Sequence, residues 1–256
     1  MNRLLSVVVA SLGITAPLSV AEQPGASNGP PDGTIVFSSL APRGWDIYLR
    51  DVDGVASRLT RHSALDFNAA FSADGQRIAF VSERDGNMEL YAMNSDGSGL
   101  QRLTSDFALD DHPTWSPDGR QIAFVSTRQP ASAGRAWNAI YAMDSDGSNI
   151  RRLSSADMAD YSPAWSPRGD LIAFASGSGR SGQSDIYVMK PNGQRRRLVV
   201  ENGGWPAFIE EGRAIAFHRQ RNGDDWDVWR IHTDGSELKR LVENASMSRA
   251  TADGSK

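Results

Sequence analysis

The sequence has 256 residues, of which 39% are apolar, and its formal net charge is −4 at pH 7. A chain of this size can bury a sizeable core as one domain. Its mildly acidic balance argues against electrostatic capture of nucleic acid. The sequence contains no cysteine, which excludes disulfides and lipid attachment at a cysteine, but leaves an oxidising compartment possible.

The N-terminal segment has the features of a cleaved secretory signal. Arg3 precedes an apolar run over residues 4–18, and the small residues Ser19 and Ala21 follow. The run is short and interrupted by serine, threonine and proline, which favours cleavage after residue 21 over a retained membrane anchor. Residues 22–31 are rich in Gly, Pro, Asn and Ser and predict a flexible linker. We therefore expect a periplasmic or secreted protein with no stable membrane insertion after cleavage.

From residue 32 to residue 256 the sequence repeats, and three markers keep step. A phenylalanine that closes the second strand of each unit recurs at Phe37, Phe80, Phe124, Phe174 and Phe217. A turn glycine recurs at Gly54, Gly97, Gly147, Gly193 and Gly235. A leucine of the last strand recurs at Leu59, Leu103, Leu153, Leu198 and Leu241. A period of roughly 40 to 45 residues with four strands per unit is typical of a β-propeller blade.

The third unit shows how each part of the repeat is built. Residues 113–124 read PTWSPDGRQIAF, in which Pro-Asp-Gly supplies a preset φ and a positive φ for a tight hairpin turn. The apolar run over residues 120–126 predicts a strand covered on both faces. Residues 140–153 read IYAMDSDGSNIRRL, a third and a fourth strand joined by a second turn at Asp146-Gly147.

The ends of the repeat predict how the ring closes. Residues 32–60 supply the second, third and fourth strands of a unit, and four units follow near 67–104, 111–154, 161–199 and 204–242. The tail SMSRATADGSK matches a first strand, with Asp253-Gly254 in the position of Asp74-Gly75. We therefore predict an all-β propeller of five four-stranded blades, the last closed by the N- and C-terminal strands, which leaves no exposed sheet edge. A six-bladed ring completed by another chain is the alternative.

The units WSPDGRQIAF, WSPRGDLIAF and FSADGQRIAF, each followed by a half similar to LYAMNSDGSGLQRLT, resemble the repeats of the TolB-type β-propeller family. The resemblance covers about residues 32–256 and implies the fold and the binding of envelope partners. The resemblance also implies a separate α/β domain before the propeller, as TolB proteins have, and we expect this chain to lack it. Family rings usually have six blades, so a count of five departs from the pattern.

The candidate site lies on one face of the expected ring. The connections between blades, and those between second and third strands, vary in length and are expected on the same face, which favours this face for binding. Residues just before the inner strands would surround the mouth of the central channel, and the longest insertion adds Arg135 and Trp137. The predicted binding residues are Asp66, Asn68, Asp110, Asp111, His112, Asp160, Tyr161, Trp205, Trp137 and Arg135.

Structural roles compete with each of these assignments. An aspartate before an inner strand often caps a turn through its own backbone, and His112 precedes a proline in a loop. The GxGxxG match at residues 177–182 has no helix after it and is discarded. The Asp-rich loop at 144–148 lacks the closing glutamate of a calcium loop and is interpreted as a turn. The run Arg195-Arg196-Arg197 is interpreted as an exposed strand segment. The sequence predicts no metal and no cofactor.

Three functions fit these observations. The first is a monomeric, non-enzymatic module that binds an envelope protein or peptide. The second is a propeller related to polysaccharide lyases or hydrolases, although a lyase would need a cluster of metal-binding histidines and the proposed ring has only His112. The third is a carbohydrate-binding propeller that uses Trp137, Tyr161 and Trp205 as platforms. The missing catalytic motif favours the first.

Overall fold

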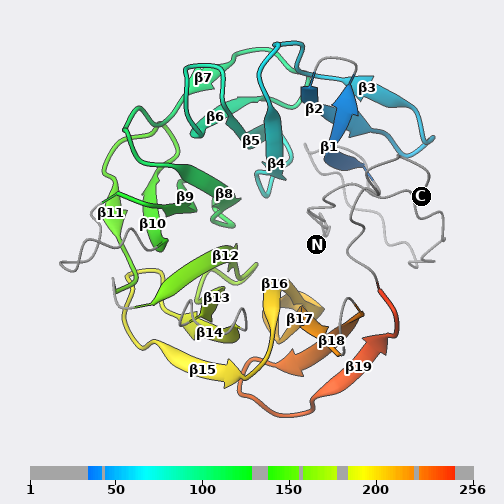
Figure 1. The fold of residues 1–256 in the computed structure, drawn as a ribbon, viewed down its shortest axis with the longest axis vertical. Coiled ribbons are helices and arrows are strands. Elements are labelled where there is room, and N and C mark those ends of the chain that lie inside the picture. Colours follow the sequence, from blue (N-terminus) through cyan, green and yellow to red (C-terminus); the bar gives the residue numbers. More distant parts are fainter. Residues whose placement is uncertain are drawn as a thin grey trace.

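The structure is a computed structural model that describes residues 34–41, 44–128, 138–155, 158–177, 184–221 and 225–245. Their strands form five antiparallel sheets, which stand around a common centre (Figure 1). The chain is therefore an all-β, five-bladed β-propeller, as the repeat predicts. The predicted signal, the linker and the C-terminal closing segment lie outside the described residues.

The first blade contains β1 (Ile35–Ala41), β2 (Gly44–Arg50) and β3 (Ala56–Arg58). The second contains β4 (Asp66–Phe71), β5 (Arg77–Ser82), β6 (Glu89–Asn94) and β7 (Gln101–Arg102). The third contains β8 (Asp110–Trp115), β9 (Gln121–Ser126), β10 (Ala139–Asp144) and β11 (Arg151–Arg152). The fourth contains β12 (Ala159–Trp165), β13 (Ile172–Gly177), β14 (Asp185–Met189) and β15 (Arg197–Val200). The fifth contains β16 (Gly204–Ile209), the 3-10 helix η1 (Glu210–Gly212), β17 (Ala214–Gln220), β18 (Trp226–His232) and β19 (Lys239–Val242).

Strand order is the same in each complete blade. In Figure 1, β4, β8, β12 and β16 lie nearest the centre, and β7, β11, β15 and β19 lie at the rim. The first sheet has three strands among the described residues, β1, β2 and β3. This agrees with the prediction that residues 32–60 supply the second, third and fourth strands of their unit.

The repeated phenylalanine lies at the centre of each of the four blades that have four described strands. Phe80, Phe124, Phe174 and Phe217 have no exposed surface. Each faces an aromatic residue on the third strand across the sheet; Phe124, for example, pairs with Tyr141, and their ring centroids are 5.9 Å apart. Such cross-strand aromatic pairs stabilise a sheet beyond the area they bury. The marker phenylalanine is therefore a core residue of the repeat.

The marker leucine is not buried in the fourth blade. Leu103 and Leu153 are buried, but Leu198 is 43% exposed and the neighbouring Val199 is 8% exposed. Tyr187 pairs with Leu198, whereas the equivalent Tyr91 and Tyr141 pair with Arg102 and Arg152, so Leu198 stands one residue before the inward position. Because side chains alternate across a strand, a shift of one residue exchanges the two faces. Val199 therefore replaces Leu198 in the core of the fourth blade.

Candidate binding face at the inner-strand ends

The two sets of variable connections lie at the same end of the blades. The connection after β5 meets the connection from the second to the third blade, where the Asp110 amide donates to the Met88 carbonyl at 2.9 Å. The same pattern recurs one blade on, where the Asp160 amide donates to the Asn138 carbonyl at 2.9 Å. We call this end of the molecule the connection face. The starts of β4, β8, β12 and β16 lie on it.

Each inner strand has a bulge at the same place on this face. Strand pairing with the second strand is interrupted around Asn68, His112, Ser162 and Trp205. These four residues all have left-handed backbones, with φ between 50° and 51°. A positive φ is uncommon for residues other than glycine, most of all for a bulky one such as tryptophan. The bulges therefore hold four different side chains on one repeated backbone conformation.

Three of the predicted residues meet between the second and third blades. The side-chain amide of Asn68 donates through Nδ2 to Asp111 Oδ1 at 2.6 Å, and His112 Nδ1 lies 2.9 Å from Asp111 Oδ2. Burial alone would raise the pKa of Asp111, but the hydrogen bonds from His112 and Asn68 outweigh it and lower that pKa. All three side chains keep partial exposure. They form a polar cluster that fixes the orientation of the His112 ring.

Trp205 belongs to an aromatic cluster at the start of the fifth blade. Its ring centroid is 5.6 Å from that of Trp226 and 6.3 Å from that of His218, both in edge-to-face arrangements. Trp205 is 37% exposed. The sequence interpretation missed Trp226 and His218, although the β17–β18 hairpin, which pairs Gln220 with Trp226, could have located them. A half-exposed tryptophan supported by neighbouring rings is a typical anchor for a partner.

The three aligned aspartates have a different environment from the one predicted. Asp66, Asp110 and Asp160 have no exposed surface. Their ion-pair partners are respectively Arg84, Arg128 and Arg196. A buried carboxylate held by a guanidinium is a structural element, and its removal leaves an uncompensated charge. These carboxylates therefore lie beneath the surface of the connection face, where they stabilise the fold and are not exposed to a ligand.

The remaining predicted residues divide into two groups. Tyr161 is partly buried and packs against the hydrophobic clusters on both sides of the fourth blade. It therefore contributes mainly to packing between blades. Arg135 and Trp137 lie outside the described residues.

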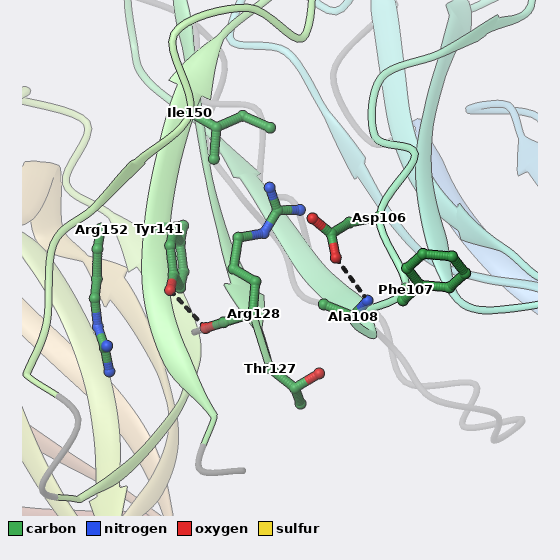
Figure 2. Close-up of a pocket in the computed structure, with 8 residues that line it drawn as sticks. All are labelled: Asp106, Phe107, Ala108, Thr127, Arg128, Tyr141, Ile150 and Arg152. Carbon is green, nitrogen blue, oxygen red and sulfur yellow. Dashed lines mark hydrogen bonds between the residues drawn. The ribbon is translucent and has the colours of Figure 1, made fainter. Parts of the chain in front are cut away.

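A cavity that the sequence did not indicate opens between the second and third blades. Its volume is about 540 Å³ (Figure 2). The lining residues are Asp106, Phe107, Ala108, Thr127, Arg128, Tyr141, Ile150 and Arg152. Two of the lining segments, 106–108 and 127–128, belong to the connections of the connection face. The cavity is therefore lined in part by the connection face.

The described residues contain no group of three or more His, Cys, Asp or Glu side chains that could hold a metal ion. No helix within these ranges is long and apolar enough to cross a membrane. The connection face therefore offers hydrogen-bonding groups, aromatic rings and guanidinium groups as its recognition chemistry.

Because His218 is buried in the aromatic cluster, we expect the stability of the fold to depend on pH. Burial lowers the pKa of His218, and its Nδ1 is buried without a hydrogen-bond partner among the described residues. The unfolded chain therefore takes up a proton before the folded chain as the pH falls below about 6.5. The free energy of unfolding should decrease below that pH, by at most about 1.4 kcal/mol per pH unit from this one group.

We expect the His218→Gln variant to lose less stability than the original chain between pH 7 and pH 5 in urea unfolding. His62 is exposed, so His62→Gln is the matched control and should keep the original pH dependence. Equal pH dependence in all three proteins would contradict the assignment.

Five blades with a repeated backbone and one variable face define a propeller of the kind that serves as a scaffold for binding sites. The family model described as the TolB beta propeller domain matches residues 26–181, and the chain belongs to this family. The Tol-Pal system protein TolB of Wolinella succinogenes is 37% identical over 75 residues, which are 28% of this chain and 18% of that protein.

Solved structures agree on the fold. TolB from Acinetobacter baumannii is similar with a TM-score of 0.71 and 22% identity, over 82% of this chain and 52% of that one. An oligogalacturonate lyase in complex with manganese is similar with a TM-score of 0.60 and 14% identity, over 81% of this chain and 61% of that one. Both are distant in sequence, so they support the fold alone. The chain spans about half the length of the solved TolB and less than a fifth of the curated one.

Proposed function

We propose that this TolB-like propeller is a non-enzymatic module that binds a protein or peptide segment in the cell envelope, in the periplasm if residues 1–21 are a cleaved signal. The observation that carries the proposal is the set of four bulges on the connection face. One backbone conformation with φ near 50° presents Asn68, His112, Ser162 and Trp205, four chemically different side chains. A repeated scaffold with varied side chains at equivalent positions is typical of recognition surfaces in repeat proteins.

The relatives support the envelope setting, since the curated match is named as a protein of the Tol-Pal system. The chemistry of the face supports binding over catalysis. His112 Nδ1 lies 2.9 Å from Asp111 Oδ2. The neighbouring carboxylate, that of Asp110, is buried in an ion pair with Arg128. Both carboxylates are therefore already engaged by other side chains of the protein.

The test is capture of partners from envelope extract by the full chain and by two variants. Trp205→Ala removes the exposed anchor of the face. Val52→Ala is the control, because Val52 is also exposed, at 51%, and lies in the β2–β3 turn at the other end of a blade. We expect Trp205→Ala to weaken capture by at least about 25-fold, because loss of a hot-spot aromatic anchor costs about 2 kcal/mol or more, and Val52→Ala to leave it unchanged. Equal capture by all three proteins would contradict the proposal.

A further inference from the structure

An arginine side chain lies over the central aromatic pair of each blade from the second to the fifth. In chain order these arginines are Arg84, Arg128, Arg196 and Arg219. The guanidinium carbon of Arg219 lies 5.3 Å from the centroid of the Phe217 ring and 5.0 Å from that of the Trp229 ring. The fifth blade therefore keeps the guanidinium group that the other three blades have at this place.

Three of these guanidinium groups are neutralised within the chain. In the fourth blade Asp160 pairs with Ser176 across the first two strands, and Arg196 donates to both side chains. The second and third blades have the same two residue types in this pair, as Asp66 with Ser82 and Asp110 with Ser126. A buried carboxylate therefore accompanies the arginine in each of these blades.

The fifth blade differs at both positions of this pair. Its register continues from the pair Gly204 and His218 to Gly203 and Arg219, which occupy the places of the aspartate and the serine. A Cβ at Gly203 would lie 2.6 Å from Phe217 Cδ2. The core of this blade therefore leaves no room for an acidic side chain at residue 203, and the arginine extends from the place of the serine.

Arg219 is held in place by neutral groups. Its Nε donates to the Asn202 carbonyl and its Nη2 to the Glu201 carbonyl, both at 2.8 Å. Within the described ranges no carboxylate lies at ion-pair distance from it, and Asp227, which lies opposite it on β18, pairs with Arg240. Burial lowers the pKa of Arg219, because the charged form loses hydration. The guanidinium is thus fixed and partly desolvated, and the described residues do not neutralise its charge.

Arg219 also lies close to the exposed aromatic anchor of the connection face. Its side chain keeps partial exposure. The segment that accepts its hydrogen bonds joins the fourth blade to β16, and Asn202 stands three residues before Trp205. Three residues of extended chain span at most about 11 Å. One short segment of a partner could therefore contact both Trp205 and Arg219.

We infer that Arg219 binds a carboxylate of the partner, beside the aromatic anchor Trp205. Guanidinium groups recognise carboxylates through charge-assisted hydrogen bonds, and the equivalent groups of the other three blades do so within the chain. Because two hydrogen bonds and two rings already fix Arg219, binding costs little side-chain entropy. The carboxylate belongs either to an acidic side chain or to a chain end, and the two sources share this chemistry. The inference rests on the proposed function for the partner being a protein or peptide.

Nuclear magnetic resonance of the full chain tests it, with the Nε–H signals of the arginines as reporters. Acetyl-Gly-Glu-Gly-amide is compared with acetyl-Gly-Gln-Gly-amide, and acetyl-Gly-Gly-Gly with a free C-terminus is compared with its amide, all at low ionic strength. Each carboxylate form that uses the site should bind at least about tenfold more tightly than its neutral counterpart, because its hydrogen bond is charged. Preference within the first pair assigns an acidic side chain, and preference within the second assigns a chain end.

The unaltered chain contains its own controls. The Arg219 signal should shift until the site is saturated, whereas the signals of Arg84 and Arg128, which already hold carboxylates, should not move. Arg219→Gln should abolish the preference for the carboxylate, and Arg219→Lys, which keeps the charge, should retain part of it. Arg120→Gln removes an exposed charge from the β8–β9 turn and should change nothing.

An Arg219 signal that no peptide shifts, equal shifts with acid and neutral peptides, or equal shifts at Arg84 and Arg128 would overturn the inference. The Trp205→Ala capture experiment reports separately. Unchanged capture there would reject the proposed function without deciding whether Arg219 binds a carboxylate.

Discussion

Replacing Arg196 with methionine is expected to lower the free energy of unfolding by about 3–5 kcal/mol, the usual loss when one partner of a buried ion pair is removed. Arg196 donates to both carboxylate oxygens of Asp160, at 2.8 and 3.3 Å, and to Ser176 Oγ at 2.6 Å. Its guanidinium carbon also lies 4.4 Å from the centroid of the Tyr187 ring. The variant would leave the fully buried Asp160 without this partner.

Urea unfolding at neutral pH checks the prediction, and two further variants show its cause. Arg195→Met changes an exposed neighbour and should alter stability by less than about 0.5 kcal/mol. The double variant Asp160→Asn with Arg196→Met should be more stable than Arg196→Met alone, because it removes the stranded charge. If Arg195→Met and Arg196→Met destabilise the chain equally, the ion pair has no special role.

This pair also shows where prediction from the sequence stopped. The run from Arg195 to Arg197 was interpreted as an exposed strand segment, and that was wrong for Arg196, which is half-buried against Phe174 and Tyr187. In the second and third blades the equivalent guanidinium comes from the segment after the second strand, as Arg84 and Arg128. In the fourth blade it arrives from the segment before β15. Because two different segments of the repeat supply the same guanidinium group, an alignment of the repeats could not identify it.

The fold itself could be predicted because its signals are local. The turn Ser116 to Gly119, the apolar second strand and the marker Phe124 each follow from short-range rules, and the structure confirms them. The aspartates before the inner strands were placed correctly along the chain, but their burial depends on arginines about 20 to 40 residues away. Long-range pairing of this kind leaves no periodic signal in the sequence.

The cavity was missed for a related reason. Its lining combines the segments 106–108 and 127–128 with Tyr141, Ile150 and Arg152, which lie in different parts of the sequence. Which of these segments meet is decided by the packing of the second blade against the third. The repeat pattern alone carries no signal for such a cavity.

The second large effect is expected at the turn glycine of the third blade. Gly147 has a φ of 92°, and a Cβ added there would lie 2.5 Å from the Leu103 carbonyl oxygen, in the preceding blade. Gly147→Ala therefore combines an unfavourable backbone conformation with a clash against backbone atoms that cannot rotate away. The turn of one blade packs on the last strand of the blade before it, so the substitution should separate the two blades locally.

Gly54→Ala isolates the first of these two costs. Gly54 has a φ of 83°, but its nearest neighbour would be the flexible end of the Arg50 side chain, at 3.1 Å. We expect Gly54→Ala to cost about 1–2 kcal/mol from the left-handed backbone alone, and Gly147→Ala to cost about 1–3 kcal/mol more because of overpacking. Thermal and urea unfolding of both variants measure the difference. Equal losses would show that the blades do not pack through this turn, because the backbone conformation would then account for the whole effect.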